Sequence, residues 1–129
     1  PNLIDKKCVI SDRFTDSTYV YQGYGKGVDI NLIKMLDKII TRNMRPSLTI
    51  LLNIDPKVGL KRSDNGINKE TRYEKMPLSY HKKINSHFLK IAKNEKNRFL
   101  IVDASLSKNT ISSIIWKRVS KKFNIKEIN

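Results

Sequence analysis

Short apolar segments that alternate with helical patterns constrain the fold of this chain more than any other feature. Three runs rich in β-branched residues or leucine, at 7–11, 47–54 and 99–102, predict buried strands. Between and after these runs, apolar residues recur at the spacing of a helix face. Because strands that alternate with helices form parallel sheets, the sequence predicts an α/β fold.

The helical patterns predict three helices. Their apolar faces consist of Leu32, Leu36, Ile39 and Ile40, of Tyr80, Ile84, Phe88 and Ile91, and of Ile111, Ile114, Ile115 and Val119. Ser107 is a predicted N-cap for the third helix, and we expect Trp116 and Phe123 to pack rather than to bind a ligand. With 129 residues and no shift in composition, the chain is predicted to be a single domain, 1–129.

The formal charge of +14 favours anionic partners, and by itself leaves nucleic acid, membrane surfaces and phosphorylated small molecules open. Many of the lysines lie in helical segments, and we interpret them as solvated helix faces. We therefore expect neither nucleic acid nor membrane as a partner. The single cysteine, Cys8, lies in an apolar strand pattern, which predicts a buried small hydrophobe and fits a reducing, cytoplasmic location.

Charged residues follow each predicted strand. Asp12 and Arg13 come after the first strand, Asp55 after the second and Asp103 after the third. Ligands of parallel sheets bind at this edge, where a carboxylate can hold Mg²⁺ through water and an arginine can fork onto phosphate oxygens. The alternative for each aspartate is that it caps the helix that follows. The adjacent arginine favours a ligand site at Asp12.

The polar residues after Arg13 are suited to reading a small ligand: Ser17, Thr18, Tyr21 and Gln22. Three alternate glycines follow, at Gly23, Gly25 and Gly27. They do not have the spacing of a phosphate-binding GxxxxGK[ST] loop, so we predict a tight turn with positive φ angles. His81 and His87 do not share a helix face, which argues against a metal site there.

The polar interval 63–77 predicts a lid. It contains Arg72, Tyr73 and Glu74, and Lys61 and Arg62 lie at its base. Cations that close over a site can neutralise the charge on a phosphoryl group during transfer. The alternative is an exposed loop with incidental charges.

Four segments together closely resemble the thymidylate kinase family, whose members transfer a phosphoryl group from ATP to dTMP: DRFTDSTYVYQGYGKG, RPSLTILLNIDPKVGLKR, TRYE and IVDAS. The resemblance runs from about Lys7 to Ser112. It implies a P-loop NTPase-type parallel sheet flanked by helices, as in nucleoside monophosphate kinases. It also implies ATP as donor, Mg²⁺ as metal, dTMP as acceptor and a homodimer.

By position, the resemblance gives Asp12 a role in holding Mg²⁺ and Arg13 a role in binding the dTMP phosphate near the point of transfer. Thr18 and Gln22 match positions near the polar edge of thymine, and Tyr21 matches the aromatic residue beneath the deoxyribose. In the remaining segments, Arg62 matches a residue that packs on adenine. Arg72 matches the lid arginine that stabilises the moving phosphoryl group, and Tyr73 and Glu74 match residues that close over the nucleotide.

The family's GxxxxGK[ST] loop has no counterpart in these residues, and its first strands would lie upstream of Lys7. We therefore interpret the chain as the C-terminal part of a thymidylate kinase domain with an incomplete sheet, and predict no measurable kinase activity for it alone. The alternatives are a kinase for another nucleoside monophosphate, an inactive remnant, and a basic module whose DNA binding weakens steeply with salt.

Overall fold

The computed structural model describes residues 8–64 and 75–125. It contains two compact units, Pro1–Asn43 and Met44–Asn129, which are described in turn. The single-domain organisation of 1–129 stays a prediction. No helix in the described ranges is both long enough and apolar enough to cross a bilayer.

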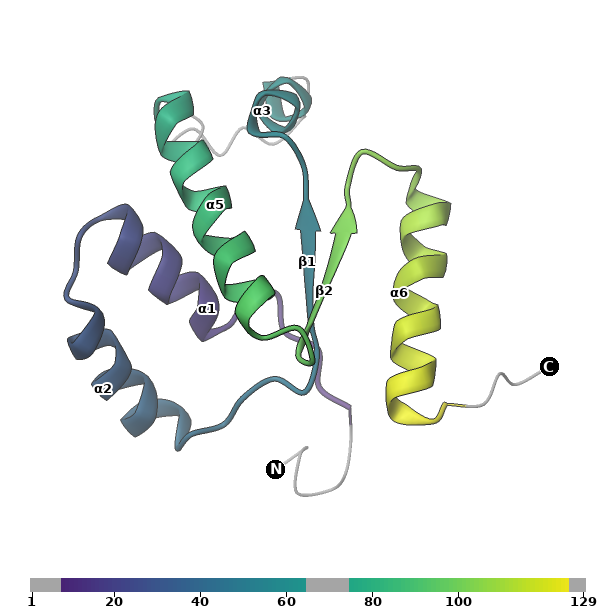
Figure 1. Ribbon diagram of the computed structural model, residues 1–129, viewed down its shortest axis with the longest axis horizontal. Coiled ribbons are helices and arrows are strands. Elements are labelled where there is room, and N and C mark those ends of the chain that lie inside the picture. Colours follow the sequence, from purple (N-terminus) through teal and green to yellow (C-terminus); the bar gives the residue numbers. More distant parts are fainter. Residues whose placement is uncertain (1–7, 65–74, 126–129) are drawn as a thin grey trace. The chain divides into compact units, whose positions relative to one another are not determined.

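The second unit is built on two parallel strands, β1 (Thr49–Asn53) and β2 (Phe99–Asp103) (Figure 1). Their register pairs Thr49 with Phe99 and Asn53 with Asp103. The strands predicted at 47–54 and 99–102 are confirmed. Because the pairing is parallel, both strands end at the same edge, where the chain turns into α3 (Pro56–Asp64) after β1 and toward α6 (Lys108–Phe123) after β2.

Helices flank the strand pair, with α5 (Leu78–Asn94) on one side and α6 on the other (Figure 1). The core of this unit consists of Ile84, Ala92, Phe99 and Val102, each at most 6% exposed. The predicted α/β class, with a parallel sheet flanked by helices, is confirmed, as are the two helices predicted from the apolar patterns at 80–91 and 111–119. In the described residues the sheet has two strands.

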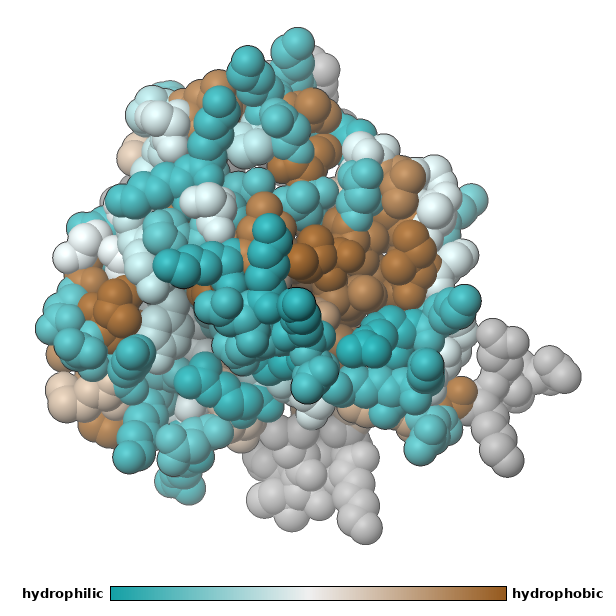
Figure 2. All heavy atoms as spheres, viewed as in Figure 1, coloured by the Kyte–Doolittle hydropathy of each residue, from teal (hydrophilic) through white to brown (hydrophobic). Residues whose placement is uncertain are grey.

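The helix α6 covers the strands only in part. Ser107 is its N-cap as predicted, and its hydroxyl accepts a hydrogen bond from the Thr110 amide at 3.2 Å. Trp116 and Phe123 are each 44% exposed, so neither is a core residue. Apolar side chains gather on the surface between the strands and this helix (Figure 2). They line an open hollow of about 430 Å³ together with Lys108 and Ser112: Leu52, Ile111, Ile115 and Trp116.

The first unit is helical. A continuous helical segment begins with α1 (Thr15–Thr18) and continues as η1 (Tyr19–Gly25), a π-helix, and α2 (Ile30–Thr41) follows. The helix predicted from the apolar residues 32–40 is thus confirmed. The buried apolar residues of this unit are Val20 of η1, which is fully buried, and Ile33 of α2, which is 5% exposed.

The prediction of a strand at 7–11 is wrong for its described part, because residues 8–11 have no strand structure. An extended apolar segment becomes a strand only where another strand accepts its backbone hydrogen bonds. In the described chain the sheet contains only β1 and β2. Cys8 is exposed, so its predicted burial is wrong for the same reason.

The glycine prediction is correct only at Gly27, whose φ of 77° is left-handed. Gly23 and Gly25 belong to η1 and do not form a tight turn. Gly23 permits close packing instead, because a Cβ there would collide with Ile30 Cδ1 of α2. At Gly27 the chain leaves the helix, and the Val28 amide reaches the Gln22 carbonyl at 3.0 Å.

Candidate functional site

The candidate site begins with a bend at Asp12 and Arg13, just before α1. Arg13 has a φ of 66°, a left-handed conformation that a residue with a Cβ rarely adopts. The Ser11 hydroxyl donates to the Arg13 carbonyl at 2.8 Å across this bend. Backbone strain of this kind persists where the surroundings impose it, and it occurs often at ligand sites.

The guanidinium of Arg13 lies over the ring of Tyr21, 5.0 Å from the ring centroid. Cation–π contacts of this geometry hold an arginine in place while its edge stays able to donate hydrogen bonds. Two residues predicted from sequence to bind the same ligand are thereby brought together. Arg13 is exposed, so its guanidinium is accessible to a ligand.

The helical segment α1–η1 has one buried face and one face that is accessible to solvent. Asp16, Val20 and Gly23 are buried and lie at intervals of four and three residues. Thr18 is exposed, and the half-buried Tyr21 and Gln22 follow it by three and four residues, so the three are neighbours on the helix surface. Ser17 is half-buried, and its amide donates to the Phe14 carbonyl at 2.9 Å.

The π-helix itself marks this segment, because π-helical turns are rare and occur frequently at functional sites. It carries Tyr21 and Gln22. On its inner side the Tyr19 hydroxyl donates to the Asp37 carboxylate of α2 at 3.1 Å, and Asp37 is 9% exposed. This polar contact joins η1 to α2 and so steadies the helix that presents the predicted ligand residues.

Asp55 and Asp103, at the ends of β1 and β2, serve local backbone structure. The Asp55 carboxylate accepts a hydrogen bond from the Lys57 amide at 2.8 Å at the start of α3. This contact agrees with the alternative prediction that Asp55 caps the helix that follows it. Asp103 accepts from the Ser105 amide at 2.8 Å and closes a turn before α6. Hydrogen bonds from Ser105, and the nearby charge of Arg62, lower the pKa of Asp103.

Asp12 differs from these two aspartates. The residue at the N-cap of α1 is Phe14, and no side chain caps that helix. The alternative that Asp12 caps the following helix is therefore wrong, and its exposed carboxylate is available for another role. Mg²⁺ is often bound by one or two carboxylates together with water and substrate phosphates, so a single aspartate beside an arginine that is predicted to bind phosphate fits that ion.

Arg62 projects from α3 to the turn after β2. Its guanidinium donates to the carbonyl of Ala104 at 2.7 Å and to that of Ser105 at 3.5 Å. It is exposed at the carboxyl-terminal edge of the two strands, where α/β proteins bind ligands. The two backbone contacts fix the plane of the guanidinium, a group to which the family resemblance gives the role of packing on adenine.

The predicted lid, 63–77, falls mainly outside the described residues, and Arg72, Tyr73 and Glu74 all lie there. Of its described neighbours, Lys61 is exposed on α3. In the described ranges no three His, Cys, Asp or Glu side chains gather as a metal-binding group. On α5, burial and the charges of Lys83 and Lys90 lower the pKa of His87.

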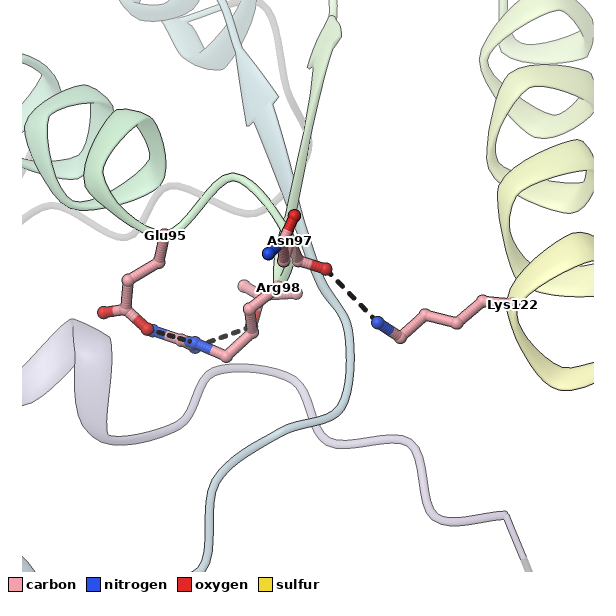
Figure 3. A network of polar contacts seen from close by, with 5 residues as sticks. Glu95, Asn97, Arg98 and Lys122 are labelled. Carbon is pink, nitrogen blue, oxygen red and sulfur yellow. Dashed lines mark hydrogen bonds and ion pairs between the residues drawn. The ribbon is translucent and has the colours of Figure 1, made fainter.

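Sequence reasoning missed a polar network at the opposite, amino-terminal edge of the strands (Figure 3). Arg98 Nε donates to Glu95 Oε2 at 2.7 Å, and an Arg98 terminal nitrogen donates to Thr49 Oγ1 at 3.1 Å. Lys122 of α6 donates to the Asn97 carbonyl at 3.2 Å. The spacing of Glu95 and Arg98 was the available signal. Sequence reasoning also missed Ser11, for which the signal was a hydroxyl two residues before Arg13.

Comparison with known proteins shows the family to which the chain belongs. The family model for thymidylate kinase matches residues 1–115. The chain belongs to the thymidylate kinase family. Among its relatives, the thymidylate kinase of Geotalea daltonii is 47% identical over 109 residues, which cover 80% of this chain and 51% of the relative. That of Geotalea uraniireducens is 42% identical over 110 residues, 81% of this chain and 52% of the relative.

A solved structure of thymidylate kinase from Ehrlichia chaffeensis has the same fold, with a TM-score of 0.68 at 26% identity. The match covers 93% of this chain and 54% of that one. This member of the thymidylate kinase family thus spans about half the length of the relatives that it matches.

Proposed function

We propose that this chain contributes the acceptor side of a thymidylate kinase, which transfers the γ-phosphoryl group of ATP to a phosphate oxygen of dTMP and yields ADP and dTDP. The observation that carries the proposal is Arg13, held in a left-handed conformation with its guanidinium stacked on Tyr21. A planar, permanently charged group placed at a bend is suited to bidentate recognition of a phosphate.

The nucleoside part of dTMP would lie along the exposed face of α1–η1. Thr18 and Gln22 supply a hydroxyl and an amide that can pair with the polar edge of thymine, and Ser17 adds a second hydroxyl. Tyr21 then has two contacts, with the Arg13 guanidinium and with the deoxyribose. In this proposal the phosphate of dTMP lies at the bend and the thymine base lies farther along the helix.

On the donor side, Asp12 would hold Mg²⁺ and Arg62 would pack on the adenine of ATP. Mg²⁺ supplies charge neutralisation at the phosphates when bound. The turn at Ala104 and Ser105, which receives the Arg62 guanidinium, favours a flat presentation of that group. Arg72, Tyr73 and Glu74 complete the proposal as lid residues on the strength of the family resemblance alone.

The proposal includes a homodimer in the cytoplasm, without nucleic acid or membrane as partner. A stripe of exposed apolar residues on α2 supports self-association: Leu32, Met35, Leu36, Ile39 and Ile40, between 43% and 76% exposed. An apolar stripe of this length on a soluble helix usually packs against a partner.

Titration of the chain with dTMP, followed by NMR, tests the acceptor role. We expect shifts confined to the segment 11–25, and Arg13→Met should weaken binding at least about tenfold because it removes a charge-assisted bond. Lys34→Met, which removes an exposed cation from α2, is the matched control and should bind normally. Equal weakening by both variants would show that general charge, and not Arg13, carries the affinity.

Competition between nucleotides separates the alternatives. A pocket that contacts the thymine methyl group should favour dTMP over dUMP by about 1 to 3 kcal/mol. Equal binding of dUMP or UMP would therefore favour another nucleoside monophosphate as the acceptor. Salt-sensitive binding of random DNA with no response to dTMP would favour the basic module instead.

A further inference from the structure

The bend at Arg13 contains an unusual backbone conformation that needs an explanation. Left-handed residues other than glycine are strained by contact between Cβ and the carbonyl oxygen, and asparagine or aspartate adopts the conformation more readily than arginine. Arg13 nevertheless has a φ of 66°. Some neighbouring group must therefore favour this conformation over the common ones.

Ser11 is the neighbour that does so. Its hydroxyl donates to the carbonyl oxygen of Arg13 at 2.8 Å, across the intervening Asp12. A serine hydroxyl that bonds to backbone two residues away stabilises a local turn in place of a helix or strand. The bond fixes the peptide group that follows Arg13, and with it the start of α1.

The side chain of Arg13 depends on this backbone. Its guanidinium lies 5.0 Å from the centroid of the Tyr21 ring, which belongs to η1. If the backbone turned to a right-handed or extended conformation, the Cα–Cβ bond of Arg13 would point elsewhere and the contact with Tyr21 would be lost. The Ser11 hydroxyl therefore holds the backbone of Arg13, and the Tyr21 ring holds its guanidinium.

We propose that Ser11 is a positioning residue for nucleotide binding. Its hydroxyl holds Arg13 in the left-handed conformation that presents the guanidinium, stacked on Tyr21, to the phosphate of a nucleoside monophosphate. Ser11 acts through Arg13 and does not touch the ligand. The identity of that ligand rests on the function proposed above, whereas the link between Ser11 and the conformation of Arg13 does not.

The test compares Ser11→Ala and Ser11→Thr in the 129-residue chain. A left-handed residue has a short distance between its amide and Hα protons and gives a strong intraresidue NOE, which reports the conformation without any ligand. We expect Ser11→Ala to lose this signal at Arg13 and to weaken dTMP binding about three- to tenfold, the size of one hydrogen bond. Threonine keeps the hydroxyl, so Ser11→Thr should retain both.

Ser86→Ala is the matched control, because Ser86 also donates from an exposed hydroxyl to a backbone carbonyl, that of Lys83 at 2.7 Å, in the other compact unit. It should leave the Arg13 signal and dTMP affinity unchanged. The inference is overturned if Ser11→Ala keeps either the NOE or the affinity, or if Ser11→Thr fails to rescue them. If the unaltered chain does not bind dTMP, the proposed function fails, and the NOE alone then decides whether Ser11 sets the conformation of Arg13.

Discussion

Arg98 joins three segments of the second unit: the end of α5, the start of β1 and the start of β2. Its side chain is only 11% exposed, and its guanidinium bonds to Glu95 and Thr49 while lying 4.4 Å from the Phe99 ring centroid. A single side chain with this many partners orders the edge at which both strands begin.

Replacing Arg98 with leucine should lower the free energy of unfolding by about 1 to 2 kcal/mol, because Thr49 and Glu95 lose a shared donor and solvent screens the 47% exposed Glu95 only in part. Urea unfolding followed by circular dichroism measures this. Lys122→Met is the control, since Lys122 makes one exposed bond to the Asn97 carbonyl, and it should cost less than about 0.5 kcal/mol. Equal losses would refute the special role of Arg98.

The same pair predicts an acid dependence. The hydrogen bond from Arg98 lowers the pKa of Glu95 below its ordinary value of 4.5, with the charges of Arg98 and Arg45 adding to this effect and burial opposing it. The folded chain therefore binds this proton more weakly than the unfolded chain. The stabilisation is complete above pH 4.5 and is lost as the pH falls through the lowered pKa.

Unfolding curves at a series of pH values would show this directly. We expect Glu95→Gln to be less stable than the unaltered chain near pH 7 and to show a shallower decline below pH 4.5. Parallel declines in the two proteins would mean that Glu95 does not contribute to the acid dependence.

Among the elements, α6 depends strongly on its first turn, because none of its residues is fully buried. Ser107→Ala removes the hydroxyl that accepts from the Thr110 amide, and we expect a loss of about 1 kcal/mol. Ser113→Ala removes a hydroxyl that bonds back to the Asn109 carbonyl within the same helix, where the loss should be near zero. Thermal unfolding of the two variants distinguishes a capping effect from a general loss of serine hydroxyls.

Elements whose apolar residues find a partner within the chain could be predicted from the sequence. The segments at 49–53 and 99–103 pair with each other, so their β-branched pattern sufficed. The segment at 7–11 has a similar pattern, but its described part has no strand to pair with. Strand pairing depends on residues elsewhere in the chain, so the composition of one segment does not predict it.

For the candidate site, the residues could be predicted from the sequence, whereas their arrangement could not. The Asp12–Arg13 pair and the polar residues that follow were recognisable by type and order. The left-handed Arg13 and its stacking on Tyr21 depend on a hydroxyl–carbonyl bond and on a π-helix, for which residue types give no rule. The glycine prediction failed at Gly23 for a related reason, since this residue permits close helix packing and does not form a turn.

At the scale of the whole molecule, the exposed apolar stripe of α2 predicts how copies of the chain associate. Replacing both Ile39 and Ile40 with lysine keeps a good helix former at each position and should convert the proposed homodimer to a monomer. Sedimentation velocity measures the change. A matched pair of lysines at Val9 and Ile10, which are 52% and 93% exposed outside the helix, should leave the dimer intact. A monomer in both cases, or in neither, would refute an interface on α2.

The two-stranded parallel sheet has a consequence for the rates at which backbone amides exchange with heavy water. In a parallel pair, alternate residues of a strand direct their amides to the partner. The Thr49 amide donates to the Arg98 carbonyl, and the Ala104 amide donates to the Asn53 carbonyl. By the same alternation, the Leu51 amide is directed toward β2, whereas the amides of Ile50 and Leu52 are directed away from it. Exchange along β1 should therefore alternate between slow and fast from one residue to the next. Any strand that pairs with the edge of β1 opposite β2 would slow Ile50 and Leu52 specifically.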